Sequence, residues 1–195
     1  PLSYSLIVLF FWEESNFVMT SLLILSISDP IAGYMGEKLG SSREFKIWYD
    51  KKTFHGTLTF FLLTIIILSL SIFYLEEYNL VQSILFILII SIFTTVSEIM
   101  SIKGSDNLSI PLISILMMIA LEEKFIYQQE SIVIIILMSK LILMTITLYL
   151  SLKIGALSLS GFFGASIMGC LLLLYGIPFH FILLASFFIL SSCLN

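Results

Sequence analysis

Three short polar segments interrupt a sequence that is otherwise strongly apolar, and each carries residue types suited to phosphate chemistry. They are SDPIAGYMGEKLG at residues 28–40, KKTFHGT at residues 51–57 and EIMSIKGSDNLSIP at residues 98–111. Carboxylates bind Mg²⁺ in proteins, usually one or two of them together with substrate phosphates. Lysine adds a point charge suited to phosphate. Brought together, these segments could therefore form an oxygen-rich site for a metal ion and a phosphate-bearing ligand.

The first segment places Asp29 directly behind an apolar run. Aspartate caps free helical N–H groups and proline suits the first helical position, so we predict that the membrane helix is broken at Asp29–Pro30. An ionisable residue at this depth is costly and normally faces a polar cavity. Gly33 and Gly36 follow on a helix face where a nucleotide or another backbone could approach closely. A capped interfacial helix packed by glycines is the structural alternative.

The second segment lies at the predicted start of a spanning helix. Lys51 and Lys52 precede Thr53 and Gly56 there, and helix amino termini attract anions. These residues are candidates for binding the phosphates of a nucleotide. The alternative is that the lysines only mark the cytoplasmic end of the helix, as lysines often do.

The third segment links two apolar runs. Glu98 ends the first run, whereas Asp106 and Asn107 precede the second. Two carboxylates and an amide placed near Asp29 would suit Mg²⁺. We therefore predict Asp29, Asp106 and Glu98 as metal ligands, and Asn107 as part of the nucleotide site.

Composition identifies the protein as an integral membrane protein. Of its 195 residues, 59% are hydrophobic and 11% are charged, and the mean hydropathy is +1.11, far outside the usual range of soluble proteins. Long apolar runs without strict alternation favour helices, which satisfy their own backbone hydrogen bonds in lipid. We predict an all-α, multi-pass bundle of about eight spans. The predicted spans cover residues 2–12, 17–39, 57–75, 80–97, 108–121, 132–150, 161–175 and 179–194.

The loops between these spans alternate in charge. One set holds most of the cations and the other most of the acids, namely Arg43, Lys46, Lys51, Lys52, Lys103 and Lys153 against Glu13, Glu14, Glu76, Glu77, Glu122, Glu123 and Glu130. The positive-inside tendency places the first set, and with it the three polar segments, in the cytoplasm. The net charge of −4 argues against nucleic-acid binding. Cys170 and Cys193 lack the spacing of a metal site or a disulfide framework. No feature indicates an oligomeric state.

In order and spacing, the three segments resemble the CTP-dependent polyprenol kinases, a family that includes phytol kinase and dolichol kinase and is related to phosphatidate cytidylyltransferase. The resemblance covers about residues 17–121 and departs from the family at His55, where a pattern like KSxEGS tends to have glutamate. It implies phosphoryl transfer from CTP to a membrane-embedded isoprenoid alcohol, with Mg²⁺ as cofactor. Asp29 and Asp106 would bind the metal, and Glu98 would bind it or accept the alcohol proton. Lys52, with Lys51 as its substitute, would hold the triphosphate.

The remainder of the chain has a different character. Residues 131–195 look like the start of an uncharacterised integral-membrane family, so we predict a kinase-like domain at residues 1–130 and a second domain after it. Gly161, Ala165 and Gly169 recur every fourth residue, as in close-packed membrane helices. Lys140 lies inside an apolar span, where it could snorkel, pair with an acid or line a cavity. The first residue, Pro1, and the apolar carboxyl terminus lead us to expect a fragment of a longer chain.

Two other functions remain open from the sequence. A cytidylyltransferase would transfer CMP to a lipid phosphate and release pyrophosphate, using the same kinds of residues. A transporter or non-catalytic membrane scaffold is the third reading. Transporters place charge near the midplane between inverted repeats, whereas most acids here lie towards one face and no internal repeat is evident.

Overall fold

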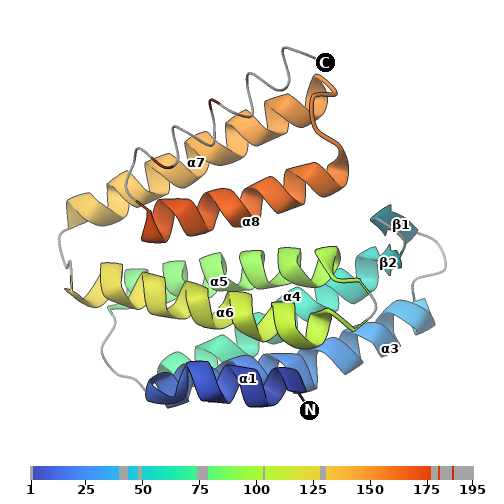
Figure 1. Cartoon of the computed structure of the whole chain (residues 1–195), viewed down its shortest axis with the longest axis horizontal. Coiled ribbons are helices and arrows are strands. Elements are labelled where there is room, and N and C mark those ends of the chain that lie inside the picture. Colours follow the sequence, from blue (N-terminus) through green and yellow to red (C-terminus); the bar gives the residue numbers. More distant parts are fainter. Residues whose placement is uncertain are drawn as a thin grey trace. The chain divides into compact units, whose positions relative to one another are not determined.

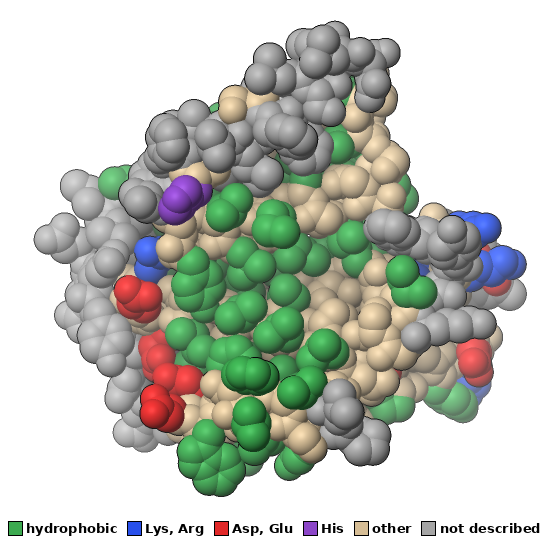
Figure 2. Space-filling view, viewed as in Figure 1, with side chains coloured by type: hydrophobic (Ala, Val, Ile, Leu, Met, Phe, Trp, Pro, Cys, Tyr) green, Lys and Arg blue, Asp and Glu red, His purple; other side chains and the backbone are tan. Residues whose placement is uncertain are grey.

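The computed structural model describes residues 2–39, 44–47, 50–73, 79–102, 104–127, 131–176, 180 and 186. It divides into two compact units, residues 1–122 and residues 123–195. Helices dominate both units (Figure 1). On the face shown in Figure 2, hydrophobic side chains are numerous and few charged side chains lie among them. This distribution is expected of helices that cross an apolar layer.

The first unit is a helical bundle with one small sheet. Its elements are α1 (Leu2–Phe10), a 3₁₀ turn (Trp12–Glu14), α2 (Ser15–Leu23), a π-helical segment (Ile24–Ser28), α3 (Asp29–Leu39), β1 (Glu44–Ile47), β2 (Asp50–Thr53), α4 (Phe54–Phe73), α5 (Leu80–Met100) and α6 (Asp106–Glu122). Helix α4 packs against α3 and α5, and α6 packs against α5, α2 and α1. Phe60, Phe86, Ile110 and Ile115 are fully buried between these helices.

Four helices in the described part of the chain are long and apolar enough to cross a membrane: Trp12–Leu39, Phe54–Ile72, Leu80–Met100 and Ile135–Lys153. The predicted number of eight spans is therefore not shown. Helices α1 and α6 form where spans were predicted, but they have 9 and 17 residues, and a full crossing takes about 20. The last predicted span, residues 179–194, lies outside the described residues apart from single positions.

The predicted break at Asp29–Pro30 is wrong. The helix continues from α2 through the π-helical segment into α3, and Asp29 has αR backbone angles (φ −66°, ψ −52°) instead of those of an N-cap. Proline cannot donate a backbone hydrogen bond, and its ring crowds the carbonyl one turn earlier. A π-helical turn is wider and changes the register of these bonds. The chain therefore accommodates Pro30 by widening the helix before it.

A two-stranded hairpin corrects the expectation of an all-α fold. Strands β1 and β2 are antiparallel, with Phe45 opposite Lys52 and Glu44 opposite Thr53. Strand β2 runs directly into α4, and Oγ1 of Thr53 accepts the backbone N–H of Gly56 at 3.1 Å. This bond satisfies one of the free donors at the start of α4. The hairpin thus fixes Lys52 and Thr53 at the amino end of α4.

The second unit contains a π-helical segment (Glu123–Tyr127), α7 (Ser131–Lys153) and α8 (Leu159–Tyr175). Helices α7 and α8 pack against each other, and Ser158 caps α8 by accepting the N–H of Gly161 at 3.1 Å. Gly155 takes a positive φ of 83° in the turn between them, a conformation that favours glycine. Lys140 is half-buried in α7 and Cys170 is a buried free thiol of α8. Cys193 lies outside the described residues.

Candidate active site

A polar cavity of about 650 Å³ lies in the first unit, where β2 enters α4, α5 ends and α6 begins. Six helices and strands contribute its walls, namely α3, β1, β2, α4, α5 and α6, and they come from positions far apart in the sequence. Its lining residues are Asp29, Pro30, Ala32, Gly33, Gly36, Glu37, Glu44, Lys51, Lys52, Thr53, Gly56, Thr57, Glu98, Ser101 and Asp106. The three polar segments of the sequence therefore meet in one cavity.

The residues that we predicted as site residues are almost all in this lining. The structure brings together Asp29, Gly33, Gly36, Lys51, Lys52, Thr53, Gly56, Glu98 and Asp106. Asn107 is the exception, because it does not line the cavity. Its backbone N–H and its side-chain Nδ2 both donate to Oδ1 of Asp106, at 2.8 and 3.3 Å. Asn107 therefore contacts the site through Asp106, whose carboxylate it orients.

Lys52 and Glu98 form the central ion pair of the cavity. Nζ of Lys52 lies 2.5 Å from Oε1 of Glu98 and donates to Oγ of Ser101 at 3.2 Å. The two charged side chains are only 19% and 9% exposed, so water screens them weakly. Lys52 is thus a largely buried cation in the cavity wall.

Lys51 makes a different kind of contact. Its Nζ lies 3.0 Å from Oε2 of Glu44 across the hairpin, and these side chains are 73% and 45% exposed. Exposed pairs of this kind contribute little to stability. The two adjacent lysines thus have distinct environments, and Lys52 is the one held inside the site.

The cavity carries an excess of negative charge. Five carboxylates line it, those of Asp29, Glu37, Glu44, Glu98 and Asp106, but only two lysines do. The charges of Asp29 and Asp106 repel each other, and Lys52 attracts Asp29. The negative charges would repel a polyphosphate unless a cation were bound with it. The charge balance therefore fits a ligand that binds together with a divalent cation.

The described residues hold no group of three His, Cys, Asp or Glu side chains close enough to bind a metal by themselves. The predicted triad of Asp29, Asp106 and Glu98 is thus not assembled as a metal cage. Two carboxylates completed by phosphate oxygens and water are the usual Mg²⁺ arrangement. Asp29 and Asp106 line the same cavity and their charges interact, whereas Glu98 is engaged with Lys52.

Several buried polar atoms at this end of the unit lack a hydrogen-bond partner. Among them are Oε2 of Glu98 and Oγ1 of Thr57, both from residues that line the cavity, and Oγ of Ser28 next to Asp29. Nδ1 of His55 is another, although His55 itself does not line the cavity. Buried polar groups in proteins are nearly always paired. Free acceptors and hydroxyls around a cavity are therefore consistent with a site that a polar ligand completes.

The glycines of the site have two different roles. A Cβ on Gly36 would lie 2.6 Å from Oγ1 of Thr53, and a Cβ on Gly56 would lie 3.0 Å from the carbonyl oxygen of Ala32. These two glycines allow α3 and α4 to approach closely. A Cβ on Gly33, in contrast, would meet nothing within 4 Å. Gly33 is therefore the glycine that leaves room for a ligand.

We expect Gly56→Ala to lower the free energy of unfolding by about 1–3 kcal/mol, the usual cost of overpacking. Gly33→Ala is expected to leave it unchanged or to raise it by up to about 1 kcal/mol, because alanine favours a helix more than glycine, and to weaken nucleotide binding instead. Thermal unfolding of the two purified variants in lipid nanodiscs, with and without CTP, measures both effects. Equal stability of the two variants would contradict the separate roles of these glycines.

Sequence reasoning missed part of the lining. Ser101 follows Glu98 by three residues, which is the spacing of one helical turn, so its presence could have been foreseen. Thr57 is at the end of the KKTFHGT segment but was not singled out. Glu44 reaches the cavity only through the hairpin, and no local signal in the sequence indicated that pairing.

Comparisons with known proteins give two partial matches. The chain is 41% identical to the uncharacterised protein RP860 of Rickettsia prowazekii (strain Madrid E) over 99 residues, which are 50% of this chain and 45% of that protein. It is 33% identical to phytol kinase 1, chloroplastic, of Arabidopsis thaliana over 128 residues, which are 60% of this chain and 41% of the kinase.

The chain therefore spans less than half the length of either relative. No family model matches the chain, and no solved structure matches it. The similarity to phytol kinase is distant, and it hints at a polyprenol-kinase-like family for this membrane protein.

Proposed function

We propose that this chain belongs to a membrane-embedded kinase that transfers the γ-phosphoryl group of CTP to the hydroxyl of an isoprenoid alcohol. The observation that carries the proposal is the convergence of Asp29, Lys52, Glu98 and Asp106 on one cavity at the end of apolar helices. The similarity to phytol kinase supports it. Nucleotide could enter this cavity from water, while the hydrocarbon part of the acceptor stays in lipid.

Phosphoryl transfer needs positioning and charge neutralisation more than covalent catalysis. Asp29 and Asp106 would hold Mg²⁺, which supplies charge neutralisation for the phosphoryl oxygens when it is bound. Lys52 would bind the triphosphate, and Lys51, Thr53 and Gly33 would lie beside the nucleotide. Lys52 starts from its contact with Glu98, so binding of a phosphate would compete with that contact.

Glu98 is the candidate general base. Its Oε1 is bound by Lys52, but its Oε2 is buried without a partner. In the proposed reaction the acceptor oxygen forms a bond to the γ-phosphorus, and the bond from that phosphorus to the β–γ bridging oxygen breaks. Oε2 of Glu98 takes the proton of the alcohol, and CDP leaves with the electron pair of the broken bond. General bases must lie within hydrogen-bond reach of the proton that they accept, which the free oxygen in the cavity wall allows.

We propose that the cavity faces the cytoplasm. Three of the described basic residues lie at the ends of α3, β1 and β2, near the cavity, namely Lys38, Lys46 and Lys51. Glu13 and Glu14 lie at the opposite end of the continuous helix Trp12–Leu39. Lys and Arg accumulate in cytoplasmic loops. Cytosolic CTP would then have direct access to the site.

Labelled CTP tests the proposal. Vesicles that contain the protein are supplied with Mg²⁺, with CTP labelled at the α- or the γ-phosphate, and with phytol, farnesol, longer polyprenols, phosphatidic acid or diacylglycerol. We expect the γ-label, and not the α-label, in an isoprenoid monophosphate. Transfer of the α-label to phosphatidic acid would replace the kinase by a cytidylyltransferase. Absence of label from every lipid would favour a transporter or scaffold.

A further inference from the structure

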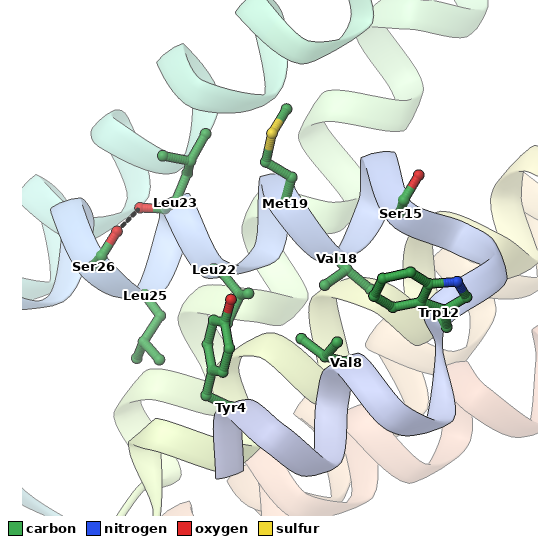
Figure 3. Close-up of a pocket in the computed structure, with 10 residues that line it drawn as sticks. All are labelled: Tyr4, Val8, Trp12, Ser15, Val18, Met19, Leu22, Leu23, Leu25 and Ser26. Carbon is green, nitrogen blue, oxygen red and sulfur yellow. Dashed lines mark hydrogen bonds between the residues drawn. The ribbon is translucent and has the colours of Figure 1, made fainter. Parts of the chain in front are cut away.

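An apolar groove of about 520 Å³ lies between α1 and α2 in the first unit. Figure 3 shows Tyr4 at the end of the groove where Leu25 lies, and Trp12 at the opposite end near Ser15. Its walls are mostly hydrocarbon, supplied by such residues as Val8 and Leu22. A groove of this kind suits an apolar chain.

We propose that this groove holds the hydrocarbon chain of the acceptor alcohol, with the hydroxyl end of the chain at the polar cavity. The inference rests on the proposed kinase function, because that function supplies an acceptor with an apolar chain. It adds a binding site for that chain and an upper limit to its length.

The groove and the polar cavity follow one another along one continuous helix, Trp12–Leu39. Leu22 and Ser26 line the groove, and Pro30 and Gly33 line the cavity. The groove reaches Ser26 and the cavity begins at Asp29, only three residues further along this helix. Ser26, Pro30 and Gly33 are all exposed. An acceptor could therefore extend from the cavity into the groove without leaving the surface of the helix.

The length of the groove limits what it can hold. The stretch of helix from Ser15 to Ser26 rises about 17 Å. Pockets of about 300–1,000 Å³ hold drug-sized ligands, and phytol and farnesol are of that size, whereas long polyprenols are much larger. Trp12, the first residue of the 3₁₀ turn Trp12–Glu14, lines the far end of the groove.

A second apolar cavity of this unit is the competing site for the chain. It has a volume of about 450 Å³ and is lined by residues of α2, the π-helical segment and α4, among them Ile27. Its α4 residues fall between Ile67 and Ile72, in the half of α4 away from Thr57. The α1–α2 groove is the larger of the two, at about 520 Å³, and the experiment below distinguishes them because Leu22 lines only the groove.

A tryptophan in the middle of the groove tests the inference. Leu22→Trp is expected to lower kcat/KM for phytol by about tenfold, since small changes of fit in an apolar pocket have effects of that order. Geraniol is an allylic alcohol like phytol but has half the chain length, so it should stop short of residue 22 and lose less than about twofold. Leu62→Trp is the matched control. Leu62 is 50% exposed on α4 and lines none of the three cavities, so both alcohols should react at the wild-type rate.

An unchanged ratio of phytol to geraniol activity in Leu22→Trp would overturn the inference. A photoreactive phytol with a diazirine on its terminal carbon gives a readout that does not depend on catalysis. We expect cross-links on the peptide that contains Trp12 and Ser15. Cross-links spread evenly over the lipid-facing sides of α4 and α5 would also overturn the inference. If wild-type protein phosphorylates no alcohol, the proposed function fails, but the cross-links still decide whether the groove binds the chain.

Discussion

The substitutions Asp29→Asn and Asp106→Asn are each expected to reduce transfer of the γ-phosphoryl group to phytol by about 100-fold or more. The substitution preserves the shape of the side chain but removes the anionic oxygen that Mg²⁺ prefers. Mutation of a residue that only hydrogen-bonds to a metal ligand typically lowers metal affinity or activity by about 10–100-fold. Loss of a direct ligand should lower the activity by at least as much. Initial rates in vesicles with γ-labelled CTP measure the effect.

Glu13→Gln is the control for the loss of one carboxylate. Glu13 is exposed and belongs to the 3₁₀ turn before α2, far along that helix from the cavity, so its variant should keep the wild-type rate. The double variant Asp29→Asn/Asp106→Asn should be no slower than either single variant, since residues that act as a unit are strongly non-additive. A wild-type rate in either single variant would contradict the assignment of that residue as a metal ligand in the reaction.

The Lys52–Glu98 pair should dominate the stability of the site. Lys52→Met or Glu98→Gln alone is expected to lower the free energy of unfolding by about 3–5 kcal/mol, because each leaves a buried charge without its partner. The double variant replaces both charges by neutral groups of similar size and should regain most of that loss. Phosphoryl transfer should be lost in all three variants. Thermal unfolding in nanodiscs, together with the labelled-CTP assay, separates the two effects.

The neighbouring lysine gives a matched control for stability. Lys51 is paired with Glu44 at the surface, and such pairs are worth about 0–1 kcal/mol. Lys51→Met should therefore leave the unfolding temperature almost unchanged. If Lys52→Met and Lys51→Met had the same unfolding temperature, the Lys52–Glu98 pair would contribute no more to stability than the exposed Lys51–Glu44 pair.

Much of the site could be predicted from the sequence because charged residues in or next to a membrane helix are energetically unfavourable and therefore stand out. Asp29 and Glu98 are acids next to or within apolar helices, and such residues usually serve a function. The partner of each could not be predicted in the same way. Lys52 and Glu98 are 46 residues apart, and their contact depends on the hairpin register, which local patterns do not encode.

The fold differs from the prediction at positions where the same residues are compatible with more than one backbone conformation. Pro30 removes a hydrogen-bond donor in any helix, but the sequence does not tell a helix break from a π-helical turn. The apolar runs of α1 and α6 mark helices correctly. Their hydropathy does not decide whether such short helices cross a membrane, because tertiary packing in the bundle also favours apolar residues.

Binding of Mn²⁺, a paramagnetic substitute for Mg²⁺, tests most directly whether the distant segments form one metal–nucleotide site. Electron paramagnetic resonance of the protein in nanodiscs measures free and bound Mn²⁺, with and without CTP. We predict one bound Mn²⁺ per protein that depends on CTP and is lost in both Asp29→Asn and Asp106→Asn. Binding of Mn²⁺ and CTP that persists unchanged in both variants would contradict the shared site and the function built on it.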